Sequence, residues 1–344
     1  MSVVTQSTPT PAHLLVYEAQ QLPKLRSNYG ESLDRSSIGW LKQTPADSPI
    51  DKMRKRYEED GYIYVKGLLP VQDVLDVREA YFAHLAPTGI LKPGTTARDG
   101  IFDTTQDPIV HNGNGSTSLP KGIERQKLLE SAHVLPIYME FVKHPKLRSF
   151  VREFMGWEEE VLAKRTLLRH NVPNGISTGV HYDRLFLRGG EAEFLTAWIP
   201  FGDCTAEGGG LMYWENSTDI GKAMEADFMK RAETFTKDER ISAFNQNMSR
   251  LGHLSHDVSN FSRDTVANEK WAKLIPQDAS MRWLISNFEA GDVVFHNPYL
   301  IHAAVKNEDR EAKIRLAADI RFYEEGAPLD QRWMRGAWRA DDGL

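Results

Sequence analysis

Cysteine is nearly absent from this sequence: Cys204 is the only one among 344 residues. An intramolecular disulfide is therefore excluded, and a reducing, cytoplasmic environment is expected. A single thiol also cannot build the cysteine clusters that hold many zinc sites. Any bound metal must rely on nitrogen and oxygen ligands.

Long apolar runs and a strong charge imbalance are missing as well. No window holds the roughly 18 uncharged apolar residues that a membrane-spanning helix needs, so no membrane partner is expected. The formal net charge is only −6, which gives no electrostatic reason to expect nucleic acid as a partner. The opening residues lack a basic segment followed by an apolar core, so they do not predict a secretory signal. We expect a small-molecule partner; a homodimer is allowed but not indicated.

Composition divides the chain into two parts. Residues 1–50 are rich in Ser, Thr, Pro and Gln, and we expect them to form an extended N-terminal arm. Residues 51–344 are expected to form one domain that begins with helical support. In this support a first helix ends near Gly61, the strand YIYVKG follows, and Pro70 opens a second helix. Further helices, broken by prolines, are expected over residues 124–157.

After residue 157 the pattern changes to short strands separated by glycine turns. Many short strands with such turns predict a sandwich or barrel, so the expected fold class is mainly β with flanking helices (α+β). Residues 217–282 interrupt the strands with a polar, helical segment. We interpret it as an insertion, which either covers a cavity mouth or is a solvated surface excursion. The candidate strands are VLAKRTLLRH, TGVHYD, FLTAWIPF, GLMYW, DVVFHN, HAAVKN and KIRLAADIRFY.

The stretch GVHYDRLF places a histidine and a carboxylate two positions apart. In a strand, His181 and Asp183 would project to one side and Tyr182 to the other. Downstream, His296 and His302 are two candidates for a third ligand. Two imidazoles and one carboxylate leave coordination positions open for a co-substrate and dioxygen, the arrangement of non-haem Fe(II) oxygenases.

The last candidate strand alternates strictly between apolar and polar residues. One side carries Ile314, Leu316, Ala318, Ile320 and Phe322, and the other carries Lys313, Arg315, Ala317, Asp319 and Arg321. A positive charge inside a barrel needs an anionic partner. The planar fork of Arg315 suits the distal carboxylate of a 2-oxo acid. Arg321 is expected to cap the strand.

Taken together, these pieces resemble the phytanoyl-CoA dioxygenase family of Fe(II)- and 2-oxoglutarate-dependent oxygenases. The matching segments are YEEDGYIYVKGLLPVQDV, HYD, TAWIPF, EGGGLMYW and GDVVFHNPYLIH, followed by Arg315. The resemblance covers residues 55–325 apart from the insertion. It implies a double-stranded β-helix core of the jelly-roll, cupin-like type, with Fe(II), 2-oxoglutarate as co-substrate and O2.

The resemblance also implies the residues of a site. His181, Asp183 and His302 match the family's iron ligands. Relatives with the same arrangement use the second downstream histidine, so His296 is expected beside the metal and not on it. Arg315 matches the arginine that binds the 2-oxoglutarate C5 carboxylate.

Three further residues are implied as contacts in the co-substrate cavity. Trp198 matches a tryptophan of the family's active-site wall, with a core aromatic as the alternative. Thr166 and His170 share one face of the strand RTLLRH, which often contacts the co-substrate in the family, with ordinary polar residues as the alternative. Ala317 stands where some oxygenases have a serine that helps to hold 2-oxoglutarate.

The predicted function is oxidation of an unactivated C–H bond in a small organic acid or secondary-metabolite intermediate, with release of succinate and CO2. Hydroxylation, desaturation and cyclisation would share this chemistry. Asp183 favours oxygenation over halogenation, because halogenating relatives have a small residue there. The alternatives are a phytanoyl-CoA-type acyl-CoA hydroxylase, a non-catalytic metal-binding cupin-like module and a zinc hydrolase. No basic cluster suits the phosphates of CoA, and no HExxH motif provides a zinc hydrolase's base.

Overall fold

Strand β11 (Arg315–Glu324) shows how the sequence builds two layers. Its apolar residues Leu316, Ala318, Ile320 and Phe322 belong to the core beneath the helices. The intervening residues face a second sheet, where Ala317 joins a separate apolar cluster. The strict alternation seen in the sequence therefore separates two environments, as predicted.

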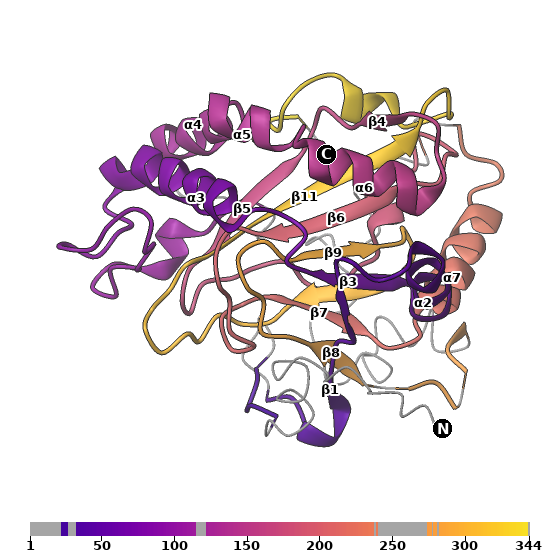
Figure 1. Cartoon of the computed structure of the whole chain (residues 1–344), viewed down its shortest axis with the longest axis horizontal. Helices are drawn as coiled ribbons and strands as arrows, with labels where there is room; N and C mark the ends of the chain where they lie inside the picture. The colour runs from indigo at the N-terminus through magenta and orange to yellow at the C-terminus, as the bar shows by residue number, and fades with distance from the viewer. Residues whose placement is uncertain are drawn as a thin grey trace, which may run out of the picture.

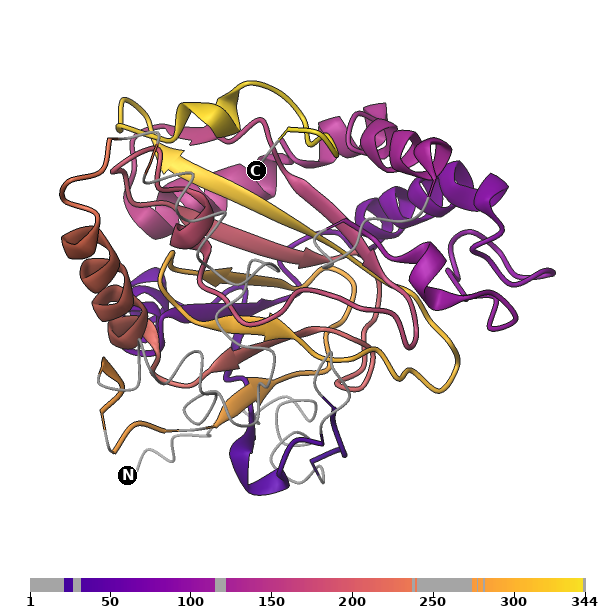
Figure 2. The ribbon, with the colours of Figure 1, turned by 180° about the vertical axis from the view of Figure 1, so that it is seen from behind.

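Two β-sheets pack against each other in the computed structural model, which describes residues 22–26, 32–114, 122–236, 239, 274–276, 278–280 and 282–342 (Figure 1). The smaller sheet has the order β1-β8-β7-β10; the larger has the order β2-β3-β9-β6-β11-β4, and β5 also pairs with β11. Seen from behind, β11 runs along the larger sheet in yellow (Figure 2). This sandwich with flanking helices confirms the predicted fold class.

Most strands follow the candidate segments, but VLAKRTLLRH divides into two strands. The predicted strand TGVHYD is wrong, because it forms only a one-residue bridge at His181 and then enters η4. The smaller sheet contains β1 (Ile38–Trp40), β7 (Leu211–Trp214), β8 (Trp283–Ile285) and β10 (His302–Ala304). The larger sheet contains β2 (Gln43–Pro45), β3 (Tyr62–Lys66), β4 (Glu160–Leu162), β5 (Leu167–Asn171), β6 (Leu195–Pro200), β9 (Val293–His296) and β11. The strands β1, β2 and β8 were not predicted.

Helices cover the outer face of the larger sheet (Figure 1). The Phe150 ring, on α6, stacks on Phe295 of β9 with ring centroids 4.9 Å apart. Burial of one such side chain contributes about 2 kcal/mol. The helices are α2 (Ile50–Asp60), α3 (Val71–Leu85), α4 (Ile123–Ala132), α5 (Pro136–Phe141), α6 (Pro145–Met155) and α7 (Thr218–Arg231). Short 3-10 helices are η1 (Arg35–Ser37), η2 (Ala86–Thr88), η3 (Pro108–His111), η4 (Asp183–Phe186) and η6 (Gln331–Met334).

The predicted helix boundaries near the N-terminus are confirmed. Helix α2 ends at Asp60, and Gly61 follows with a φ of 77°, a left-handed conformation that glycine adopts without strain. Pro70 precedes α3 as its N-cap. These signals act locally, so the sequence alone was sufficient to find them.

The segment expected to form an extended arm differs from that expectation in its described part. Strand β1 pairs in parallel with β8, and β2 pairs in parallel with β3, so residues 38–45 belong to the two sheets. Ile38 and Leu41 are buried there. The polar composition of residues 1–50 gave too little weight to these few apolar side chains. Residues 1–21 of the predicted arm lie outside the described residues.

Helix α7 begins the segment that was interpreted as an insertion. It packs on the loop between β9 and β10: the Asn297 amide donates to the Thr218 hydroxyl at 2.9 Å, and a Cβ at Gly221 would lie 2.0 Å from the Tyr299 carbonyl oxygen. The Ser217 hydroxyl accepts the Ile301 N–H at 3.0 Å. The start of the segment is therefore tied to the sandwich. Most of the remainder lies outside the described residues.

Candidate metal centre

Two histidines and one aspartate meet on the inner side of the smaller sheet. His181 and His302 are backbone neighbours, each donating its N–H to the other's carbonyl, at 3.0 and 2.8 Å. Asp183 begins η4, directly after the bridge. One side-chain donor atom from each residue lies within 4.8 Å of the other two. The structure thus brings together the three residues that the sequence predicted as metal ligands.

Both histidines are held in the tautomer that a metal requires. Nδ1 of His181 lies 2.8 Å from the Gly179 carbonyl oxygen, and Nδ1 of His302 lies 2.8 Å from the Leu300 carbonyl oxygen. Each Nδ1 therefore carries the proton and donates it, which leaves Nε2 with a free lone pair. Both Nε2 atoms lie 3.7 Å from Asp183 Oδ1.

Burial sets the charge of the two imidazoles. It lowers the pKa of His181 and of His302 to about 3, because the charged ring is disfavoured away from water. Both rings are thus neutral at neutral pH, the form that binds a metal. Two neutral imidazoles and one carboxylate, with no thiolate, fit a non-haem Fe(II) site.

The Asp183 carboxylate is held by three donors. Its Oδ2 accepts the Thr196 hydroxyl at 2.6 Å and lies 3.4 Å from His296 Nε2, while Oδ1 lies 3.0 Å from Arg321 Nη2. Burial alone would raise the pKa of Asp183, but Arg321 and His296 outweigh it and hold the pKa well below its ordinary range. The carboxylate is therefore ionised and fixed in orientation.

His296 lies beside the cluster and not within it. Its Nε2 faces Asp183 Oδ2, whereas both other histidines face Oδ1. Its Nδ1 lies 3.2 Å from the Tyr213 hydroxyl. This placement agrees with the expectation that His302 is the third ligand and His296 its neighbour.

A narrow cleft between the two sheets joins the metal cluster to Arg315. His181, His302, Trp198 and Arg315 all line it. The Arg315 guanidinium donates to neutral acceptors, the Gly209 carbonyl at 2.9 Å among them. Burial lowers the pKa of Arg315 to about 10. The cleft therefore contains a buried cation that no described carboxylate pairs with, as a site for the distal carboxylate of a diacid would.

Trp198 forms part of the cleft wall, as expected. The residue lies on β6, opposite Asp319 of β11, and its ring packs against Phe288 with centroids 4.7 Å apart. It is also part of the apolar cluster between the sheets. Both interpretations of this tryptophan therefore hold at once: it is a core aromatic, and it faces the cleft.

Thr166 and His170 lie on the opposite side of the larger sheet, away from the cleft. The Tyr138 hydroxyl donates to Thr166 at 2.7 Å, and the Tyr81 hydroxyl lies 2.6 Å from His170 Nδ1. Both tyrosines come from the helices, α5 and α3. Both side chains are bound on the helix side of the sheet, contrary to the expectation that they contact a co-substrate, and neither lines the cleft.

Arg169 is the residue of β5 that faces the cleft. It lies directly across from Ala317, forms an ion pair with Asp319 and donates to the Thr178 hydroxyl at 2.7 Å. The sequence reasoning missed this pair. The sequence does not single Arg169 out, because it is the first of three consecutive polar residues in β5.

Arg321 does not cap β11, contrary to expectation. It is 1% exposed and forms its ion pair with Asp183. The Trp333 ring of η6 covers one face of the guanidinium, 4.7 Å from its central carbon. Burial lowers the pKa of Arg321, but the Asp183 and Asp319 carboxylates raise it above its ordinary value.

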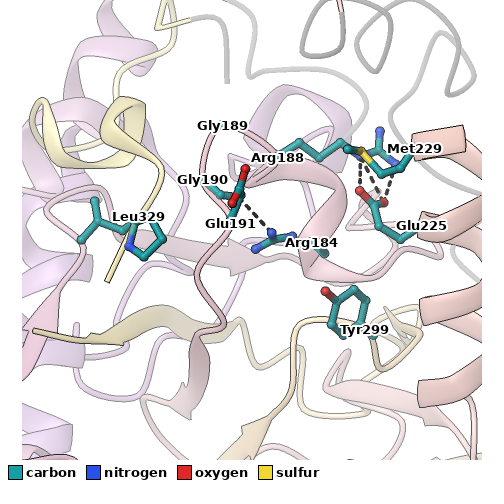
Figure 3. Close-up of a pocket in the computed structure, with 10 residues that line it drawn as sticks. Arg184, Arg188, Gly189, Gly190, Glu191, Glu225, Met229, Tyr299 and Leu329 are labelled. Carbon is teal, nitrogen blue, oxygen red and sulfur yellow. Dashed lines mark hydrogen bonds and ion pairs between the residues drawn. The ribbon is translucent and has the colours of Figure 1, made fainter. Parts of the chain in front are cut away.

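A second pocket of about 480 Å³ lies on the outer side of the segment that follows Asp183. Figure 3 shows Arg188 and Glu225 joined across it, and Arg184 turned toward the loop that contains Gly190. The Glu225 carboxylate also accepts the Tyr182 hydroxyl at 3.0 Å. Tyr182 thus faces away from the metal cluster, as predicted, and ties α7 to the ligand-bearing segment.

Comparison with known proteins assigns the family. The sequence profile of the phytanoyl-CoA dioxygenase (PhyH) family matches residues 57–314. The chain belongs to the phytanoyl-CoA dioxygenase family. The resemblance carried by the sequence motifs is thereby confirmed. This PhyH chain is an iron(II)- and 2-oxoglutarate-dependent dioxygenase, and its cluster of two imidazoles and a carboxylate fits the iron.

Individual relatives of this PhyH chain are distant. It is 22% identical over 290 residues to 1-deoxypentalenic acid 11-beta-hydroxylase of Streptomyces arenae, covering 81% of this chain and 83% of that protein. The carbocyclase SnoK from nogalamycin biosynthesis aligns with a TM-score of 0.46 at 17% identity, over 83% of this chain and 87% of the other. EctD from S. alaskensis with bound Fe aligns with a TM-score of 0.45 at 14% identity, over 83% of this chain and 79% of the other.

Among the helices in the described ranges, none combines the length and apolar character needed to cross a bilayer.

Proposed function

We propose that this enzyme oxidises an unactivated C–H bond of a small organic acid or secondary-metabolite intermediate. The observation that carries the proposal is the single cleft lined by His181, His302 and Arg315. A metal cluster and an arginine without a carboxylate partner, in one cleft, suit a 2-oxo diacid that chelates a metal at one end. The acid named in the curated relative, 1-deoxypentalenic acid, supports a carboxylic acid as substrate class.

In this proposal, His181, Asp183 and His302 hold the iron through two Nε2 atoms and one carboxylate oxygen. Bound iron supplies the chemistry of cleaving dioxygen with electrons from 2-oxoglutarate, which leaves as succinate and CO2, and of oxidising the substrate's C–H bond. Thr196 and His296 keep the Asp183 carboxylate in position. Metal ligands held by such surrounding hydrogen bonds bind more tightly.

Arg315 binds the distal carboxylate of 2-oxoglutarate. Its guanidinium is buried and already oriented by the Gly209 and Arg169 carbonyls and the Ser177 hydroxyl. A preoriented charged donor forms a strong bond to a carboxylate. Trp198 excludes water from the wall of the cleft, where it would otherwise compete for the metal's open positions.

A cytoplasmic location and a single oxygenase domain, which includes residues 38–45 as well as 51–344, belong to the same proposal. The location is supported by the single cysteine. An acyl-CoA substrate is the second candidate within the family, whose name includes phytanoyl-CoA. The cleft that joins the metal cluster to Arg315 is narrow and its charges are buried, which favours a small acid over an acyl-CoA.

Succinate release tests the proposal. The protein is loaded with Fe(II), 2-oxoglutarate and O2, and a panel of small carboxylic acids is compared with their CoA thioesters. We expect acid-stimulated succinate formation that His181→Ala and Asp183→Ala abolish, because two ligands hold Fe(II) poorly. Asp47→Ala, at an exposed aspartate, is the matched control.

Three outcomes would contradict the proposal in different ways. Full turnover by Asp183→Ala would refute the ligand assignment. Metal binding without succinate from any substrate would indicate a non-catalytic metal module. Hydrolysis supported by zinc, with no use of 2-oxoglutarate, would indicate a zinc hydrolase.

A further inference from the structure

The buried charges around the cleft do not balance. Three arginines and two aspartates take part: Arg169, Arg315 and Arg321 against Asp183 and Asp319. The two histidine ligands are neutral. Bound Fe(II) adds two positive charges and 2-oxoglutarate adds two negative ones, so the loaded cleft keeps one positive charge. An uncompensated buried charge is costly, so the imbalance calls for one further anion.

The ion pairs identify which arginine carries the unbalanced positive charge. Arg169 is paired with Asp319. Arg315 would receive the distal carboxylate of 2-oxoglutarate. Asp183 and the C1 carboxylate together neutralise the metal. Arg321 remains, because its partner Asp183 then serves the iron.

Unpaired donors on Arg321 support the same conclusion independently. Its Nη2 lies 3.0 Å from Asp183 Oδ1, while Nε and Nη1 are buried and have no hydrogen-bond partner in the part of the chain that the structure describes. Buried polar atoms without partners are rare in folded proteins and mark a missing ligand or water. Trp333 covers one face of the guanidinium, so its edge is what remains for a ligand.

The position of Arg321 places that ligand beside the metal. The residue contacts Asp183 Oδ1, the same atom that faces both histidines. Arg315 lies six positions earlier on the same face of β11, which is roughly 20 Å along a strand. The two arginines therefore serve different groups, and Arg321 is not a second contact to the distal carboxylate.

We infer that Arg321 binds a carboxylate at the metal, most simply that of a substrate that is an organic monoanion. The inference rests on the proposed function and specifies its substrate class. The same chemistry has a second source, the C1 carboxylate of 2-oxoglutarate. The two sources are distinguished by experiment.

The first measurement compares an acid with its amide on the unaltered protein. Iron(II) and 2-oxoglutarate are bound without oxygen, and the visible charge-transfer absorption of the complex is followed. Cyclohexanecarboxylate and cyclohexanecarboxamide serve as probes, since they share a ring and differ in charge. We expect the carboxylate to perturb the absorption at a concentration roughly 10-fold or more below that of the amide, as a charge-assisted hydrogen bond would give.

The second measurement uses Arg321→Gln and Arg321→Lys. Loss of the preference for the carboxylate probe in Arg321→Gln, with 2-oxoglutarate affinity retained, assigns the substrate's carboxylate. A fall in 2-oxoglutarate affinity of roughly 10-fold or more, partly restored in Arg321→Lys, assigns the C1 carboxylate. Cobalt(II) titration of each variant separates these effects from weaker metal binding, and Arg335→Gln, at an exposed arginine, is the control.

The outcomes separate this inference from the proposed function. Equal effects of the two probes, together with unchanged 2-oxoglutarate affinity in Arg321→Gln, would overturn the role of Arg321 alone. No charge-transfer absorption in the unaltered protein would contradict the proposed function itself. Should Arg321→Gln not fold, the same comparisons are made with Arg321→Lys, whose loss of the planar fork is expected to weaken carboxylate binding by a smaller factor.

Discussion

Replacing Arg315 by leucine should separate what this residue does for function from what it does for folding. The buried guanidinium donates to the Gly209 and Arg169 carbonyls at 2.9 and 3.3 Å and to the Ser177 hydroxyl at 3.1 Å. All three acceptors are neutral. Burial lowers the pKa of Arg315 to about 10, which corresponds to a cost of about 3 kcal/mol for the charged form.

Arg315→Leu removes that cost and leaves three acceptors without a donor, at about 1 kcal/mol each. The two terms nearly cancel, so the free energy of unfolding should change by no more than about 1 kcal/mol. Loss of the charged contact to a carboxylate should cost about 2–5 kcal/mol of binding, or roughly 30- to 5,000-fold in 2-oxoglutarate affinity.

Two assays check both halves of this prediction. Urea unfolding measures the stability of the variant, and an anaerobic 2-oxoglutarate titration of the iron-loaded protein measures affinity. Arg335→Leu, at an exposed arginine, is the matched control. A stability loss above about 3 kcal/mol with unchanged 2-oxoglutarate affinity would refute the reasoning, since it would make Arg315 a structural residue.

Two further predictions concern buried polar groups elsewhere. Thr196→Val removes the hydroxyl that donates to Asp183 Oδ2 at 2.6 Å. Iron affinity, measured by competition with a chelator, should therefore fall about 10- to 100-fold, whereas Thr196→Ser should retain the affinity. Equal iron affinities of the two variants would show that the hydrogen bond is dispensable. His133 accepts the Leu168 N–H at 2.9 Å, and burial lowers its pKa from 6.5 to about 4. The folded state therefore resists a proton that the unfolded chain accepts, so stability present above pH 6.5 should be lost as pH falls toward 4. Urea unfolding should show a loss of about 2 kcal/mol between pH 7 and 5 from this residue, and His133→Gln should reduce that slope; an unchanged slope would exclude His133 as its source.

The sequence located His181 and Asp183 because their signal is local, whereas His302 was chosen over His296 from the resemblance to the family. HYD at 181–183 and the alternation of β11 each specify which side chains share a face, and the structure follows both. The glycine turns and proline-opened helices were predicted for the same reason. None of these inferences required knowledge of what packs against what.

The sequence could not predict which residues of β5 face the cleft. Both of its faces are covered, so apolar alternation does not distinguish the cleft side from the helix side. Thr166 and His170 were chosen because they share one face of a strand that often contacts the co-substrate in the family, but Tyr138 and Tyr81 bond to them from distant helices. Arg169 is recognisable only after its pairing with Asp319 is known.

The prediction that Arg321 caps β11 was wrong for a related reason. A charged residue near a strand end is usually solvated, and the sequence does not reveal that η6 returns to cover this one. The Trp333 ring lies on the Arg321 guanidinium, and its indole N–H donates to the Phe186 carbonyl at 3.2 Å. Contacts between segments far apart in sequence decide this burial.

The backbone bridge between His181 and His302 links metal binding to the closure of the sandwich. The two ligands lie on segments that are distant along the chain, and only the folded sheet sets them side by side. A cation that binds this arrangement and not the unfolded chain stabilises the fold in proportion to the logarithm of its concentration. The supply of iron would then set the stability of the folded protein as well as its catalytic rate.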